Sequence, residues 1–149
     1  MRIASSPVYL DASALAKVYI PEPESEVLES ALAGRRDLIV SRLAVTEVAS
    51  AMARRVRERQ LRRREMAAAY RTLTGHVAKG RFLRAHITAT AHSEAERLLM
   101  TLGERVPLRA ADGLHLALAA LAGARTLVTF DRRMAAAAAA VGTFDLIER

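Results

Sequence analysis

The sequence predicts a single α/β domain over residues 1–149, a three-layer α/β/α sandwich with a mainly parallel central sheet. Short apolar runs that suit buried strands alternate along the chain with longer stretches of helical spacing. This alternation favours a parallel sheet, because parallel neighbours need crossover helices between them. The length of 149 residues fits one domain with a substantial core. Cysteine is absent, so neither disulfides nor thiolate metal ligands are available.

The first half of the chain contains two predicted strands and four predicted helices. We expect a strand over residues 3–10, helices over 12–20 and 24–33, a strand over 37–40, and two long helices between 41 and 79 that meet near 60–61. Asp11 or Ser13 can cap the first of these helices, and Ser41 the third. Prolines follow the first helix and Gly34 follows the second, as expected at helix ends. Most boundaries therefore have a residue type that accounts for them.

The second half of the chain continues the alternation of strands and helices. We expect a strand over 82–87, helices over 90–102 and 110–122, a strand over 126–130, a helix over 132–141 and a last strand over 143–147. Gly103 and Pro107 separate the first two of these helices. The run Ala135–Ala140 is low in complexity, but alanine is the best helix former. We therefore expect a closely packed helix there.

The basic excess of the chain is mostly arginine and is concentrated in one segment. Seven arginines gather in it: Arg54, Arg55, Arg57, Arg59, Arg62, Arg63 and Arg64. The formal net charge of +7 favours polyanionic or acidic partners through long-range attraction. The cluster suits either the solvated face of a helix or a binding surface. Nucleic acid and an acidic protein tail are equally open as partners, because guanidinium groups pair with phosphates and carboxylates alike.

The distribution of apolar residues argues against a membrane protein. No apolar stretch approaches the roughly 20 residues that are needed to cross a bilayer. Residues 1–7 lack the long apolar segment of a signal peptide. We therefore expect no membrane contact and a cytoplasmic location.

Four acidic residues differ from the other carboxylates in their positions. Asp11 and Asp131 each follow an apolar strand-like run and open a helix. In a parallel sheet, residues just past the carboxyl ends of neighbouring strands share one crevice, where such folds bind ligands. Asp112 begins an almost wholly apolar helix, and Glu47 lies beside an apolar helical stripe. These four residues are our candidates for one shared site.

Each candidate also has a purely structural explanation. Asp11 and Asp131 can act as N-caps, a role worth about 1 kcal/mol. Asp112 lies in the first turn of its helix, where the macrodipole favours an anion, and Glu47 can be a rim carboxylate paired with an arginine. His115, three residues after Asp112 on the same helical face, either assists at the site or is a satisfied core histidine. The residue types alone leave these alternatives open.

Several other catalytic motifs are absent from the sequence. It contains no Walker-type loop, no Gly-x-Gly-x-x-Gly and no Gly-x-Ser-x-Gly. The histidines lack the spacing of a structural zinc site. Nucleotide binding, serine hydrolysis and structural zinc therefore have no support.

Four segments taken together resemble the PIN-domain ribonucleases, most closely the VapC-type toxins of bacterial toxin–antitoxin pairs. These segments are Tyr9–Leu15, the isolated Glu47, Ala111–Ala117 and Leu127–Asp131. The resemblance covers nearly the entire chain in order and spacing. It implies that the acidic quartet of this family corresponds to Asp11, Glu47, Asp112 and Asp131, with the first and third dominant in coordinating magnesium.

The resemblance implies a metal-dependent endoribonuclease. Crowded carboxylates repel, and a hard cation such as Mg²⁺, or alternatively Mn²⁺, compensates their charge. The ion would activate water for in-line attack on an RNA phosphodiester, with no covalent enzyme intermediate. Ser13 and Thr129 correspond to hydroxyl residues beside the first and last acids and are secondary candidates, as is His115. Gly113 stands where the family more often has alanine.

The resemblance also implies a homodimer and a cognate antitoxin whose tail covers the acidic groove. We place part of the antitoxin contact in the helical region 44–79, which is basic and carries an apolar stripe. Aromatic residues make up only 4% of the chain, so base stacking is a poor means of recognising RNA. Selectivity would instead depend on RNA shape and loops.

Two other functions are compatible with the same residues. One is a non-catalytic nucleic-acid-binding module on the same fold, in which the acids serve as caps and salt-bridge partners. The other is a metal-dependent phosphatase, for which an Asp-x-Asp pair is expected where this chain has Asp11, Ala12 and Ser13. The sequence does not specify the RNA, the antitoxin or the number of metal ions, nor whether DNA is cut or Glu47 is a direct ligand.

Overall fold

Five parallel strands and seven helices make up the computed structural model, which describes residues 1–3 and 5–148. In chain order the elements are β1 (Val8–Leu10), α1 (Ala12–Tyr19), α2 (Ser25–Leu32), β2 (Leu38–Ser41), α3 (Arg42–Arg57), α4 (Arg63–Ala78), β3 (Leu83–Ala85), α5 (Ala89–Leu102), α6 (Ala110–Leu121), β4 (Thr126–Thr129), α7 (Arg132–Val141) and β5 (Asp145–Glu148). Every predicted strand and helix is present in the predicted order, so the α/β prediction is confirmed.

The sheet has the strand order β3-β2-β1-β4-β5, and all neighbouring pairs are parallel. The chain first proceeds outward from β1 through β2 to β3, and then returns to the other side of β1 for β4 and β5. The direction of winding therefore reverses between β1 and β4. In open α/β sheets, the crevice beyond the carboxyl ends of strands at such a switch point is the usual ligand site.

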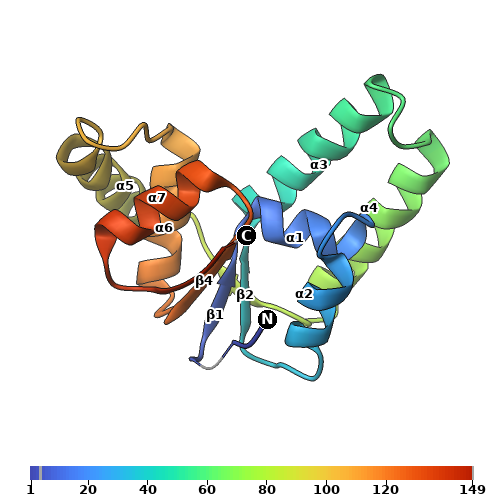
Figure 1. The fold of residues 1–149 in the computed structure, drawn as a ribbon, viewed down its shortest axis with the longest axis horizontal. Helices are drawn as coiled ribbons and strands as arrows, with labels where there is room; N and C mark the ends of the chain where they lie inside the picture. The colour runs from blue at the N-terminus through green and yellow to red at the C-terminus, as the bar shows by residue number, and fades with distance from the viewer. Residues whose placement is uncertain (4, 149) are drawn as a thin grey trace.

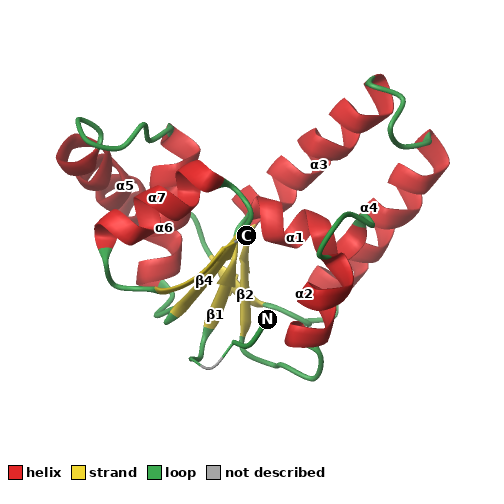
Figure 2. Ribbon diagram, viewed as in Figure 1, coloured by secondary structure: helices red, strands yellow, loops and turns green. Residues whose placement is uncertain are grey.

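Helices cover both faces of the sheet, as Figures 1 and 2 show. Helices α1–α4 pack on the face that carries Val8 and Leu10, whereas α5–α7 pack on the face that carries Tyr9 and Leu127. Successive strand residues point to opposite faces, so the apolar strand runs supply two cores at once. The three-layer sandwich is therefore confirmed.

The first strand is shorter than the predicted range 3–10, part of which, Ala4, lies outside the described residues. Its ladder begins at Val8, because the preceding Pro7 has no N–H to donate. The carbonyl of Pro7 instead accepts from the backbone N–H groups of Arg125 and Thr126 at 2.9 and 3.1 Å. The strand thus starts where Pro7 ties it to the beginning of β4.

The third strand is also shorter than predicted, covering Leu83–Ala85 where the sequence predicts 82–87. It lies at the edge of the sheet, and β2 is its one neighbouring strand in the described part of the chain. The side chain of Phe82, just before it, packs instead with the core beneath α1–α4. The apolar residues Phe82 and Ile87, which flank this short strand in the sequence, continue its apolar pattern, and the sequence therefore predicted a longer strand.

None of the helices in the described part of the chain is long and apolar enough to span a membrane. The longest helices, α3 and α4, carry many charged residues. They project together from one side of the sheet (Figure 1).

Leu127→Ala is expected to lower the free energy of unfolding by about 2–5 kcal/mol, because it leaves a cavity in a fully buried site. Leu121→Ala is the matched control, since Leu121 is 53% exposed, and it should change stability by no more than about 0.5 kcal/mol. Urea unfolding followed by circular dichroism measures both. Equal losses in the two variants would contradict the packing of β4 between the helical layers.

Candidate active site

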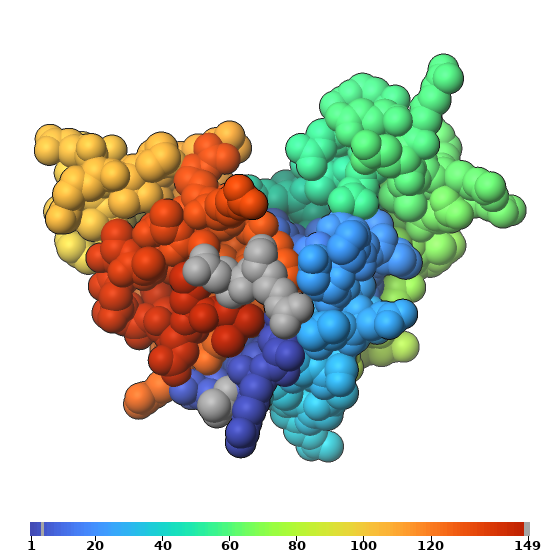
Figure 3. Space-filling model, viewed as in Figure 1, coloured from blue at the N-terminus to red at the C-terminus, as the bar shows by residue number. Residues whose placement is uncertain are grey.

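A cavity of about 580 Å³ opens beyond the carboxyl ends of the strands. It lies between α1 and α3 on one side and α6 and α7 on the other, and Figure 3 shows the notch between the two groups of helices. Its walls include all four predicted acids and two of the secondary candidates, namely Asp11, Glu47, Asp112, Asp131, Ser13 and His115. The fold therefore brings together residues that are far apart in the sequence.

Asp11 is buried at the end of β1, with 3% of its surface exposed. Its Oδ1 caps α1 by accepting from the Ala14 N–H at 2.9 Å and from the Ser13 hydroxyl at 2.7 Å. Its Oδ2 accepts from the Thr129 hydroxyl at 2.5 Å. Burial raises the pKa of Asp11, and these hydrogen bonds only partly oppose that effect. The predicted cap is confirmed. The same carboxylate also lines the cavity, and its burial makes the charged form costly to desolvate.

The hydroxyls of Ser13 and Thr129 join the ends of β1 and β4. Ser13 Oγ accepts from the Phe130 N–H at 2.7 Å, and Thr129 Oγ1 accepts from the Asp131 N–H at 3.0 Å. Both hydroxyls also donate to Asp11. They therefore fix the position of Asp11 relative to the loop that carries Asp131.

Asp131 caps α7, which confirms the structural role that the sequence predicted for it. Its Oδ1 accepts from the Arg133 N–H at 2.8 Å and from the Met134 N–H at 3.4 Å. The side chain nevertheless lines the cavity. Capping and a place in the site are therefore compatible, since the cap fixes where the carboxylate lies.

Asp112 lies in the first turn of α6 and is 8% exposed. Its Oδ2 accepts from the Arg109 N–H at 2.8 Å. Arg133 Nε lies 3.8 Å from the same oxygen, and this buried nitrogen has no hydrogen-bond partner among the described residues. Asp112 is thus held by the N-terminus of α6 and lies close to the positively charged Arg133 side chain. Its predicted position in the first helical turn is confirmed.

Glu47 contacts a histidine where the structural explanation from sequence had an arginine. Its Oε2 lies 2.6 Å from His115 Nε2, and the other ring nitrogen, Nδ1, lies 2.8 Å from the hydroxyl of Tyr9. The Tyr9 hydroxyl donates to Ser41 Oγ at 3.0 Å, in the buried layer beneath α6. The arginine pairing, one of the two explanations left open by the sequence, is therefore not the contact that Glu47 makes, because α6 presents the buried His115 directly to α3.

Tyr9 is the residue of this group that the sequence interpretation missed. It lies in an apolar strand and has the alternation of a core residue, so nothing in the pattern distinguishes it. Its ring meets that of His115 edge to face, with centroids 5.8 Å apart. Burial raises the pKa of Tyr9, which keeps its hydroxyl protonated beside the histidine.

The four acids line one cavity but do not converge on one point. Among the described residues, no three Asp, Glu, His or Cys side chains are placed so that together they could hold a metal ion. Magnesium in proteins is often held by only one or two carboxylates and keeps several waters. The donors are mainly carboxylate oxygens, which hard divalent cations prefer. The donor type in the cavity wall therefore suits such an ion.

Basic side chains surround the acids at the cavity wall. They are Lys17, Arg54, Arg55, Arg57 and Arg109. Two of them are engaged with Glu22: Lys17 Nζ at 3.1 Å from its carboxylate, and Arg55 through a direct ion pair. A negative floor with a positive rim suits a polyanionic ligand that must approach several carboxylates.

Comparison with known proteins is consistent with this fold. Residues 8–140 match the model of the PIN domain. Ribonuclease VapC45 of Mycobacterium tuberculosis (strain CDC 1551 / Oshkosh) is 35% identical over 137 residues, which is 91% of each chain.

Two crystal structures share the fold. The toxin VapC20 of Mycobacterium tuberculosis, described as cleaving the sarcin–ricin loop, has a TM-score of 0.68 at 19% identity, over 87% of this chain and 94% of that one. VapBC2 from Rickettsia felis, bound to a DNA fragment from its promoter, has a TM-score of 0.66 at 14% identity, over 95% of this chain and 97% of that one. The family match and the shared architecture together establish that this chain belongs to the PIN-domain family.

Proposed function

We propose that this protein is a metal-dependent endoribonuclease that hydrolyses RNA phosphodiesters, and that it is the toxin of a type II toxin–antitoxin pair. The observation that carries the proposal is that Asp11, Glu47, Asp112 and Asp131 line one cavity of a PIN-domain chain. A relative that is 35% identical is named a ribonuclease, which supports the same reaction class. The basic rim supports a polyanionic substrate.

We assign the principal ion, Mg²⁺ or alternatively Mn²⁺, to Asp11 and Asp112. These two carboxylates are the most buried of the four, so a cation offsets the largest desolvation cost there. Asp131 and Glu47 would hold a second ion or position the attacking water. When bound, a divalent ion supplies a water of lowered pKa and offsets charge on the departing oxygen.

The remaining residues of the site orient these carboxylates. Ser13 and Thr129 donate to the two oxygens of Asp11 and so fix the plane of its carboxylate. His115, anchored by Tyr9, holds Glu47 against the wall of the cavity. Arg54 and Arg57 attract the phosphate backbone toward the acids.

An antitoxin and a second copy of the chain are the proposed protein partners. The support for the antitoxin is that the VapBC2 structure, which has the same fold, contains a toxin with its antitoxin. The homodimer and the cytoplasmic location are predictions from the sequence. Co-purification with the product of a small reading frame directly upstream tests the first of these partners.

Asp112→Asn is expected to reduce RNA cleavage by about 1000-fold or more, because loss of a principal metal ligand removes several kcal/mol of transition-state stabilisation. Asp145→Asn is the control, since Asp145 is an exposed aspartate on β5 away from the cavity. Cleavage of total RNA by the purified proteins in Mg²⁺, with mapping of the new ends, measures the effect. Unchanged cleavage by Asp112→Asn would exclude the proposed nuclease site, and turnover of a phosphomonoester without RNA cleavage would favour a phosphatase.

Thr129→Val is expected to weaken activity or metal affinity by about 10- to 100-fold, as is usual when a partner that orients a metal ligand is lost. The substitution preserves shape but removes the hydroxyl that donates to Asp11 and accepts from Asp131 N–H. Thr126→Val, in the same strand, is the matched control because its hydroxyl donates to the Ser5 carbonyl. Equal activity of the two variants would show that the Thr129 hydroxyl has no such role.

Asp11→Asn is expected to raise the melting temperature at neutral pH in the absence of divalent ions. Burial raises the pKa of Asp11, so the folded protein holds this proton more tightly than the unfolded chain does. The ionised carboxylate therefore costs stability as pH rises from about 4 toward the folded pKa and above it. Asparagine caps helices as well as aspartate, so the substitution removes mainly that cost.

Thermal unfolding of both proteins across pH measures this difference. It should vanish below about pH 4, where the aspartate is protonated in both states. A variant that is less stable than the wild type at every pH would contradict the assigned cost of burying Asp11.

A further inference from the structure

The excess of positive over negative charge arises in one part of the fold. Residues 42–79, which form α3, α4 and their connecting turn, contain ten Arg or Lys and three Asp or Glu. The rest of the chain contains thirteen of each. The whole net charge of +7 therefore lies on this helical pair, which we call the arm.

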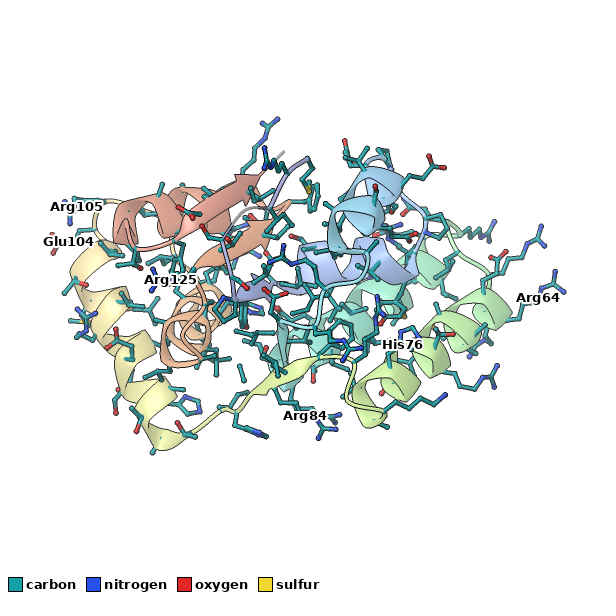
Figure 4. All side chains as sticks on the ribbon, turned by 90° about the horizontal axis from the view of Figure 1, so that it is seen from below. Arg64, His76, Arg84, Glu104, Arg105 and Arg125 are labelled. Atoms are coloured by element: carbon teal, nitrogen blue, oxygen red, sulfur yellow. The ribbon has the colours of Figure 1, made fainter. Side chains whose placement is uncertain are left out.

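The arm extends away from the sheet as a pair of long helices (Figure 1). Helix α3 has 16 residues and is therefore about 24 Å long. Its first half contributes Glu47 to the catalytic cavity, and its second half contributes Arg54 and Arg57 to the rim. Figure 4 shows Arg64 at the far end of the arm, opposite the end of the molecule that carries Arg105.

Basic residues line two hollows in succession along the arm. The first is the catalytic cavity. The second, of about 520 Å³, lies at the turn between α3 and α4 and is lined in part by Arg59, Arg62 and Arg63. These basic residues, together with Arg64 beside them in the sequence, form what we call the track.

The arginines of this track are available to a ligand. Arg57, Arg59, Arg62, Arg63 and Arg64 are all exposed. Of the seven arginines from 54 to 64, only Arg55 forms an ion pair with another residue that the structure describes. The exposed positive charges along the arm repel one another. A bound polyanion would reduce this repulsion, which the chain's own carboxylates leave largely uncompensated.

The chemistry of the tip favours a phosphate backbone over a protein tail. Protein interfaces have an apolar and aromatic centre, whereas nucleic-acid interfaces are polar and strongly positive. Within the described part of the arm, Tyr70 is the sole exposed large apolar residue, and it lies outside the turn. At the tip, exposed guanidinium groups outnumber the apolar side chains, since the hollow there is also lined by the half-buried Val56 and Leu61.

We propose that the arm is a docking track for the RNA backbone, on which phosphates outside the scissile bond bind the tip arginines and direct the strand along α3 into the catalytic cavity. This inference rests on the proposed ribonuclease function. The contacts are to phosphate, so they supply affinity and orientation without reading sequence. The length of α3 separates the tip from the acids, and substitutions there change RNA binding and not the chemical step.

The test compares two variants that lose the same charge. In the arm variant, Arg59, Arg62, Arg63 and Arg64 are replaced by Gln. In the control, the exposed residues Arg2, Arg36, Arg105 and Arg125, all outside the arm, are replaced by Gln. Anisotropy of a fluorescein-labelled single-stranded RNA, measured in EDTA over a series of KCl concentrations, gives the Kd and its salt dependence. Circular dichroism confirms that both variants are folded.

The arm variant is expected to bind about tenfold more weakly or worse at roughly 0.1 M salt, with its slope of log Kd against log salt reduced by about 3, as four lost phosphate contacts require. In cleavage assays KM should rise while kcat stays constant. The control should retain most of the slope. Replacing the same four arm residues by Lys should restore the slope, because it restores the charge.

Three outcomes would overturn the docking track. Equal weakening in the arm variant and the control would show that only net charge matters. An unchanged Kd for RNA, together with lost binding of the upstream-encoded antitoxin, would show that the arm is a protein-binding surface. A fall in kcat with unchanged KM would place the arm in the chemical step. Binding is measured without metal and therefore independently of cleavage. If RNA binding depends on the arm but the protein cuts no RNA, the nuclease proposal is refuted while the docking track stands.

Discussion

The burial of Asp11 between the ends of β1 and β4 is the constraint on which the candidate site depends. The fold places this carboxylate where water is largely excluded, which raises its pKa, and then surrounds it with the hydroxyls of Ser13 and Thr129 and the N-terminus of α1. These donors stabilise the charge only in part. A divalent cation would complete the compensation, which is why we regard this residue as the centre of the proposed metal site.

The topology explains why the other acids gather near Asp11. The sheet reverses its winding between β1 and β4, so the loops that follow these strands lie side by side and bring Asp131 next to Asp11. Helices α3 and α6 come from opposite faces of the sheet, and their contact through Glu47 and His115 lies in the cavity wall. The cavity is lined by four helices, α1 and α3 on one face of the sheet and α6 and α7 on the other, so the packing of these helices on the sheet sets the width of the cavity.

The sequence predicted the order of elements because that order depends on local signals, whereas the assignment of the four acids to one site also relied on the resemblance to the PIN-domain family. Strand runs, caps and breakers are visible in the chain, and Asp11 and Asp131 follow strands directly. The contacts of Glu47 could not be predicted, because its pairing with His115 arises from the packing of α3 against α6. Tyr9 was missed for the same reason, since a buried hydroxyl in an apolar strand has no sequence signature. The arginine cluster was visible, but only the fold shows that it forms a projecting arm.

Isothermal titration calorimetry with Mn²⁺ measures whether the buried carboxylates bind a divalent ion. We expect that the wild-type protein takes up at least one ion and that the double substitution Asp11→Asn, Asp112→Asn abolishes the uptake while the protein stays folded. No uptake by the wild type, or equal uptake by both proteins, would contradict this expectation.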